Sequence, residues 1–187
     1  MNGFFKRQLA DYVEYHRDPW NCAFHVLGIL TLFSAAILPL SMWPVRALGE
    51  HTTMAPIMVL PVLIYWLLLD TALGTAILGA AVLLLSIAAL IVGHAGATTV
   101  WTITALFIVI GLASQIVGHR VFENRQPALV DNPAHLLLGP MFVMAKLFIA
   151  LGFRRDLAAI IDPAPPHPPR GPSSFSRENQ AEPLPHS

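Results

Sequence analysis

The chain has 187 residues, of which 55% are hydrophobic and 12% are charged, and its formal net charge is zero. The charged fraction is well below the roughly 25% of an average soluble domain, and the apolar runs are too long for a water-soluble core, so the composition predicts a membrane protein. A zero net charge gives no electrostatic case for a nucleic-acid partner, and a single cysteine, Cys22, excludes an intrachain disulfide framework and a multi-thiolate metal site.

The N-terminal region predicts a short helix followed by a first membrane span. Residues 3–16 place apolar side chains near one face and charged side chains on the other, which is typical of an amphipathic helix. Asp18 and Pro19 form a helix-start signal, and the helix predicted over 20–43 is apolar enough to cross a bilayer. About twenty polar or mixed residues precede it, so we expect no cleavable signal peptide.

Further apolar stretches follow along the chain. Three of them approach the 20 residues that a membrane crossing requires, and we expect them to be spans: 54–70, 72–93 and 99–118. We expect Asp70 to cap a helix between two of these spans. The stretch 135–153 is shorter and contains Lys146, which predicts an interfacial or re-entrant helix whose lysine snorkels to the interface.

The basic residues predict the topology. They concentrate in the N-terminal segment, after the fourth span and in the tail, whereas the loop at 93–98 has none. Four spans with both termini in the cytoplasm satisfy the positive-inside rule at every loop. We therefore predict an all-α, polytopic helical bundle in a bacterial inner membrane, or in the endoplasmic reticulum of a eukaryote. It forms one domain over 1–160, and 161–187 is a disordered Pro-rich tail.

This topology brings polar residues from distant parts of the chain into one membrane leaflet. They lie at the cytoplasmic start of the first span or just past the end of the fourth: His16, Asn21, His25, His119 and Glu123. Within each block, a four-residue spacing puts Asn21 with His25, and His119 with Glu123, on one helix face. His51 and His94 fall at the opposite surface.

Imidazole and carboxylate ligands with open positions suit iron(II) that activates dioxygen, and zinc is the competing metal. The alternative is that these residues are helix caps, interfacial anchors or an ion pair. We interpret the other histidines, including His135, as structural or solvent-exposed. Asp131 either starts a helix or contributes to the site.

Two blocks of sequence also carry a family resemblance. The first contains Tyr15-His16, Pro19, Asn21 and His25. The second contains Val117-Gly118-His119, Val121-Phe122-Glu123, Arg125, Pro127-Ala128-Leu129, Asp131-Asn132, Gly139-Pro140, Phe142 and Leu151-Gly152-Phe153. Together with the spans between them, these blocks resemble the membrane 2-hydroxy fatty acid dioxygenase family over about residues 8–157.

The resemblance implies an iron(II)-dependent enzyme of fatty acid α-oxidation that uses dioxygen to shorten a 2-hydroxy fatty acid by one carbon. It implies His16, His25 and His119 as iron ligands. We interpret Glu123 as a further ligand or as a partner of one. Lys146 stands where the family carries glutamate, and His135 where it carries glutamine, so substrate or activity can differ here.

The substrate carboxylate needs a cationic partner near the membrane surface. Three arginines near the motifs are candidates to bind it together with Asn21, because a guanidinium recognises a carboxylate in a bidentate manner: Arg17, Arg120 and Arg125. Each is otherwise an ordinary positive-inside arginine. The competing functions are another membrane metalloenzyme acting on lipid, such as a hydroxylase or a zinc hydrolase, a non-enzymatic membrane carrier, and a structural membrane protein.

Overall fold

The structure is a computed structural model that describes residues 3–49, 52–122 and 135–161. Its α-helices, in chain order, are α1 (Gly3–Val13), α2 (Pro19–Ser41), α3 (Met54–Leu69), α4 (Thr71–His94), α5 (Ala97–Val117), α7 (His135–Ala150) and α8 (Arg155–Ile161). A short 3₁₀ helix, η1 (Arg46–Leu48), follows α2, and a π-helical turn, η2 (Gly118–Phe122), continues α5. The all-α prediction is confirmed for the described residues.

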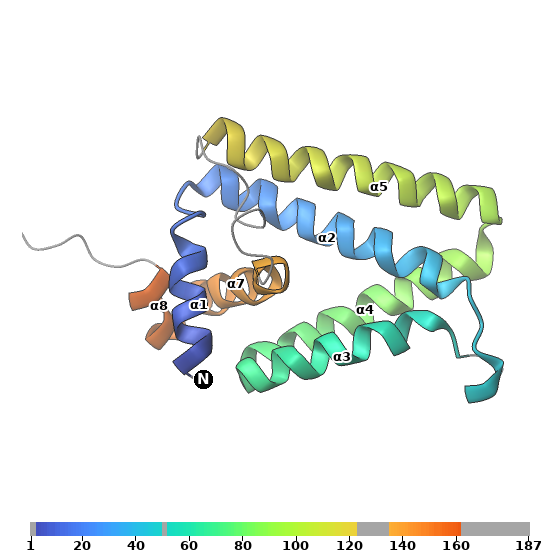
Figure 1. Ribbon diagram of the computed structural model, residues 1–187, viewed down its shortest axis with the longest axis horizontal. Coiled ribbons are helices and arrows are strands. Elements are labelled where there is room, and N and C mark those ends of the chain that lie inside the picture. Colours follow the sequence, from blue (N-terminus) through green and yellow to red (C-terminus); the bar gives the residue numbers. More distant parts are fainter. Residues whose placement is uncertain (1–2, 50–51, 123–134, 162–187) are drawn as a thin grey trace, which may run out of the picture.

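The helices form two long pairs that are closed at one end by shorter helices. In Figure 1, α2 runs beside α5 and α3 runs beside α4, while α1, α7 and α8 gather at the end where α2 begins. Small residues let α2 and α5 approach closely. A Cβ atom on Gly111 would lie 2.6 Å from Leu32 Cγ, and one on Gly118 would lie 2.5 Å from Asn21 Oδ1.

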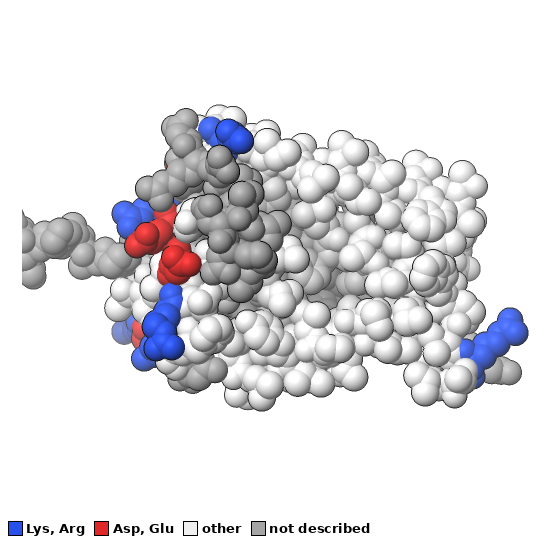
Figure 2. Space-filling view, in the orientation of Figure 1, with Lys and Arg blue, Asp and Glu red and all other residues white. Residues whose placement is uncertain are grey.

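Three helices are long and apolar enough to cross a membrane: α2, α4 and α5 with its extension to Phe122. The predicted span at 54–70 corresponds to α3, whose 16 residues extend only about 24 Å, less than the roughly 30 Å of a hydrocarbon core. Figure 2 shows charged side chains mainly at the end that carries α1 and α8, with a smaller group near η1 and an uncharged expanse between.

The N-terminal helix packs as its pattern predicted. Phe5, Leu9, Tyr12 and Val13 are buried on one face of α1, where they contact a core that includes Leu157 of α8. The carboxylate of Asp18 accepts hydrogen bonds from the backbone of Trp20 and Asn21, which confirms the predicted start of α2.

The junction between α3 and α4 is fixed by an ion pair that the sequence did not indicate. Asp70 caps α4 as predicted by accepting from Leu73 N at 3.0 Å, and Arg154 donates to both of its oxygens at 2.9 to 3.1 Å. Burial alone would raise the pKa of Asp70, but the hydrogen bonds from Arg154 and Leu73 N lower it overall. Arg154 thereby ties this junction to the start of α8.

Candidate metal centre

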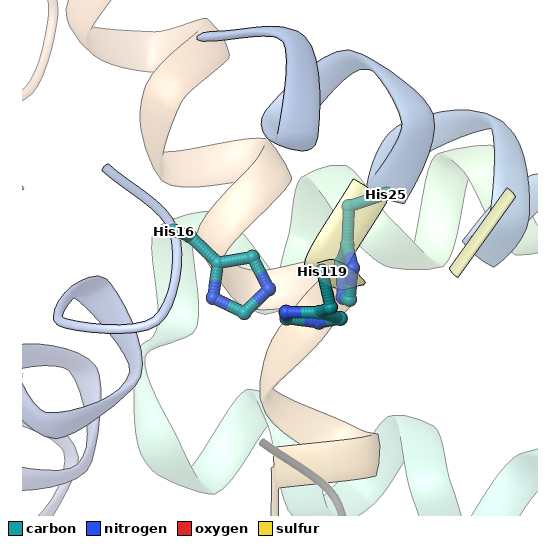
Figure 3. A group of neighbouring side chains, drawn as sticks. All are labelled: His16, His25 and His119. Carbon is teal, nitrogen blue, oxygen red and sulfur yellow. The ribbon is translucent and has the colours of Figure 1, made fainter. Parts of the chain in front are cut away.

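Three histidines from separate parts of the chain meet beside the start of α2. His16 lies between α1 and α2, His25 lies on α2, and His119 lies on η2. Their rings point toward one another in Figure 3. Each contributes one ring nitrogen to a group in which all three nitrogens lie within 4.8 Å of one another, which confirms the predicted proximity.

The surroundings of this cluster exclude most water. His16 and His119 are 2% and 1% exposed, and His25 is half-buried. The ring centroids are 4.3 Å apart for His16 and His25, 5.0 Å for His16 and His119, and 5.3 Å for His25 and His119. π-Helical turns are rare in proteins overall, but many of those that occur lie at functional sites. Here the π-helical turn η2 contains His119, whose ring faces the other two.

Hydrogen bonding sets the tautomer of His16. Its Nδ1 lies 2.9 Å from the backbone carbonyl oxygen of Tyr12, which only accepts, so Nδ1 carries the proton and donates. The lone pair is therefore on Nε2, which is buried and has no hydrogen-bond partner. Metal-ligating histidines are commonly oriented by such a bond from the other ring nitrogen.

Tyr12 also positions His25. Its hydroxyl group lies 2.6 Å from His25 Nε2, and its ring stacks on His16 at a centroid distance of 4.1 Å and an interplanar angle of 6°. Burial, with a smaller contribution from Cys22, raises the pKa of Tyr12, so the hydroxyl stays protonated. His25 Nδ1, the other ring nitrogen, is buried without a hydrogen-bond partner. The sequence pattern puts Tyr12 on the apolar face of α1 and gives no indication that it contacts two of the histidines.

The electrostatics favour the neutral form of the His16 imidazole. Burial and the neighbouring His25 lower the pKa of His16 to about 2 in the absence of a metal ion. A neutral imidazole is the form that binds a metal. Nitrogens bound at about 2 Å from one ion lie roughly 3 to 4 Å apart, so small side-chain movements would bring the three into one coordination sphere.

The residues present thus fit a metal ion. Two buried ring nitrogens that lack hydrogen-bond partners face a third imidazole, and such a donor set holds iron(II) or zinc with positions left for other ligands. Glu123, which was predicted beside His119, lies outside the described residues, as do Arg125, Asp131 and His51. His94 is exposed at the C-terminal end of α4, remote from this site, and donates from Nδ1 to Leu90 O at 2.9 Å.

Asn21, Arg17 and Arg120 are described, and they differ in accessibility. Arg17 and Arg120 are exposed beside His16 and His119, respectively. Asn21 is fully buried and donates from Nδ2 to Tyr15 O at 3.1 Å, while its side chain packs against Gly118. Asn21 therefore links the turn that carries His16 to the turn that carries His119.

Lys146 lies elsewhere than the sequence predicted, and Cys22 and His135 have partners that the sequence did not indicate. The side chain of Lys146 does not extend toward a membrane–water interface as predicted. It donates from Nζ to Cys22 Sγ at 3.2 Å. Cys22 is buried, and it donates to the carbonyl oxygen of His16. His135 is 3% exposed, so the expectation of a structural residue holds and that of a solvent-exposed one does not. Its Nε2 lies 2.9 Å from Asp11 Oδ2, and its ring contacts Tyr12.

Comparisons with known proteins identify relatives of this chain. Residues 3–151 match the family described as 2-hydroxy-palmitic acid dioxygenase Mpo1-like. The chain is 35% identical over 159 residues to the 2-hydroxy-palmitic acid dioxygenase MPO1 of Saccharomyces cerevisiae, and the match covers 84% of this chain and 87% of the yeast protein. No solved structure gives a significant match.

Proposed function

This chain belongs to the Mpo1-like family, and on that premise we propose that it is an iron(II)-dependent dioxygenase that shortens 2-hydroxy fatty acids by one carbon in fatty acid α-oxidation. The observation that carries the proposal is the cluster of His16, His25 and His119, because it brings three imidazole nitrogens together and is the one such group of possible metal ligands among the described residues. A 2-hydroxy fatty acid and dioxygen are the proposed substrates.

Iron(II) is the metal that suits this chemistry. Zinc has no redox chemistry, whereas iron(II) held by nitrogen and carboxylate ligands with open positions binds and activates dioxygen. His16 through Nε2, His25 through Nδ1 and His119 would hold the ion. Glu123 is proposed as a further ligand, or as a group that hydrogen-bonds a ligand or substrate.

The protein's own groups prepare this site in three ways. The Tyr12 carbonyl keeps the proton of His16 on Nδ1 and away from the ligand position. The Tyr12 hydroxyl fixes the His25 ring by bonding Nε2. Phe142 lies against both Tyr12 and His16, with ring centroids 5.1 and 5.5 Å away, and limits the access of water. Exclusion of water protects reactive species from side reactions.

The substrate head group is proposed to bind at the polar end of the bundle. Arg17 and Arg120 are exposed next to two of the histidines, which supports a role in carboxylate binding that Arg125 and Asn21 would share. The acyl chain would remain on the apolar side of the site. This arrangement suits a substrate that partitions into lipid.

A membrane location completes the proposal. We propose an integral membrane protein in which α3 forms a fourth, short span beside the three longer ones and both termini are cytoplasmic. The distribution of arginines and the apolar sequence of α3 support this topology. Reporter fusions at the C-terminus test it, and external exposure of a C-terminal reporter contradicts it.

The decisive experiment uses anaerobically purified, iron-loaded protein in lipid. Addition of 2-hydroxypalmitate and dioxygen should yield the fatty acid one carbon shorter, detected by mass spectrometry. The His16→Ala protein should give none, and the His94→Ala protein should match the wild type, because His94 is exposed at a distance from the cluster. Activity that requires zinc instead of iron, or hydrolysis without oxygen consumption, would replace this function with a different metalloenzyme.

A further inference from the structure

We infer that an apolar cavity bounded by α2, α3, α4 and α7 holds the acyl chain of the substrate and limits its length. The nature of the occupant rests on the proposed function. The cavity has a volume of about 340 Å³. Aliphatic and aromatic side chains line it, and small residues such as Ala36, Ala80 and Ala81 leave the space open.

The cavity offers no polar group that would favour a polar occupant. The indole N–H of Trp66 is the single side-chain donor among the lining residues, and it already donates to Leu137 O at 2.7 Å. A hydrocarbon chain gains free energy by leaving water for such surroundings. The lining chemistry therefore matches the part of the substrate that does not react.

One end of the cavity adjoins the metal centre. Val26 lies next to His25 in sequence, Ile29 lies one helical turn beyond it, and both line the cavity. Gly139 is located between the two sites, because a Cβ atom there would lie 2.7 Å from Ile29 Cδ1 and 3.3 Å from the Tyr12 hydroxyl oxygen. That hydroxyl contacts His25. A chain leaving the metal centre would therefore enter the cavity beside Gly139.

The dimensions fit a long acyl chain. The lining residues on α2 extend from Val26 to Leu40, and fourteen residues of α-helix extend about 21 Å. The acyl chains of one bilayer leaflet span about 15 Å, which is half of the hydrocarbon core. A long-chain fatty acid is of similar length, so it is shorter than the cavity. An extended chain would thus lie along α2, with its methyl end near Ala36. Ala36 and Ala80 are exposed, so the cavity also opens toward the lipid from which such a substrate comes.

Chain-length selection tests this assignment. Ala36→Phe should abolish the shortening of 2-hydroxystearate and 2-hydroxypalmitate while leaving that of 2-hydroxyoctanoate within about twofold of the wild type. The short chain would end before residue 36. Ala89→Phe is the matched control, because Ala89 is exposed on α4 but does not line the cavity, and its chain-length profile should be unchanged. An unchanged profile in Ala36→Phe would overturn the assignment.

A second measurement does not depend on turnover. A 2-hydroxy fatty acid with a diazirine at its methyl end is photolysed with the metal-loaded protein in the absence of dioxygen. Labelling should concentrate on the α2 and α4 segments around Ala36 and Ala80, and excess 2-hydroxypalmitate should suppress it. Labelling spread over lipid-facing residues such as Leu83, without competition, would refute the cavity. Competed labelling in a protein that shortens no 2-hydroxy acid would retain the cavity as an acyl site and reject the proposed reaction.

Discussion

Removal of the Tyr12 hydroxyl group should weaken metal binding while leaving the helices in place. Tyr12→Phe retains the ring that stacks on His16 and packs on Phe142, but it removes the 2.6 Å contact with His25 Nε2. When His25 binds a metal through Nδ1, Nε2 carries the proton and donates to the Tyr12 oxygen. The substitution leaves that donor buried without a partner.

The size of the effect follows from the burial of this pair. Tyr12 is 1% exposed, so water does not readily replace its hydroxyl. Leaving a buried donor unsatisfied costs about 1 to 3 kcal/mol, which corresponds to roughly a fivefold to 150-fold loss of metal affinity. Changes to groups that orient metal ligands have effects of about this size. The loss is greater in the metal-bound state, because the metal prevents the ring from turning to another partner.

The assay is an anaerobic competition for iron(II) between the purified protein and a chelator. Tyr65→Phe is the matched control, since Tyr65 lies on α3 and the described part of the chain provides it with no hydrogen bond. Its affinity should equal that of the wild type. If Tyr12→Phe binds iron as tightly as the control while folding normally, the hydroxyl does not orient His25 and our account of the site is wrong.

Three further predictions concern the metal, the helix junction and the tail. Replacing any histidine of the metal centre with alanine should remove most bound metal while the protein stays in the membrane, whereas His94→Ala should retain the metal. Glu123→Gln should abolish metal binding if Glu123 is a ligand and reduce it slightly if it is not. Arg154→Met should lower the free energy of unfolding by about 2 kcal/mol, as measured by thermal unfolding in detergent, because Asp70 is 4% exposed and would lose the ion pair with Arg154. Since the folded-state pKa of Asp70 is lowered, the stability that the ion pair contributes is present at neutral pH and declines as the pH falls through the acidic range. An effect of Arg154→Met that is undiminished at low pH would contradict this assignment. Truncation after Asp162 should leave metal content and activity unchanged, and a loss of either would show that the tail belongs to the folded unit.

The sequence predicted the helices well because long apolar runs leave little choice of structure in a membrane. The predicted limits 20–43 and 72–93 differ from those of α2 and α4 by one or two residues. The predicted limits 54–70 differ from those of α3 by one residue, but the 16 residues of α3 are fewer than the roughly 20 that a membrane crossing requires. It did not predict α8, because seven residues are too few to show a clear helical period.

Proximity of the three histidines was predictable because topology alone places the two motif blocks at the same end of the bundle. The contacts that orient them were not. Tyr12 reads as one apolar residue among several on α1, and nothing in the pattern says that its hydroxyl reaches His25 on the next helix. The four-residue spacing of Tyr12 and His16 was the available signal, because it puts both rings on one side of the chain. Lys146 was misjudged for a similar reason, since its partner Cys22 is 124 positions away.

The order in which the chain is synthesised has a consequence for this site. His16 and His25 leave the ribosome early, but His119 follows only after α3, α4 and α5. A metal ion bound to all three would close a loop of about a hundred residues and so act as a late cross-link on a chain whose early helices are already in lipid. The helices on which α1 docks, α7 and α8, are synthesised later still, so α1 gains these partners only when the chain is nearly complete. Metal binding would therefore be a late event of assembly that follows the insertion of the helices and does not guide it.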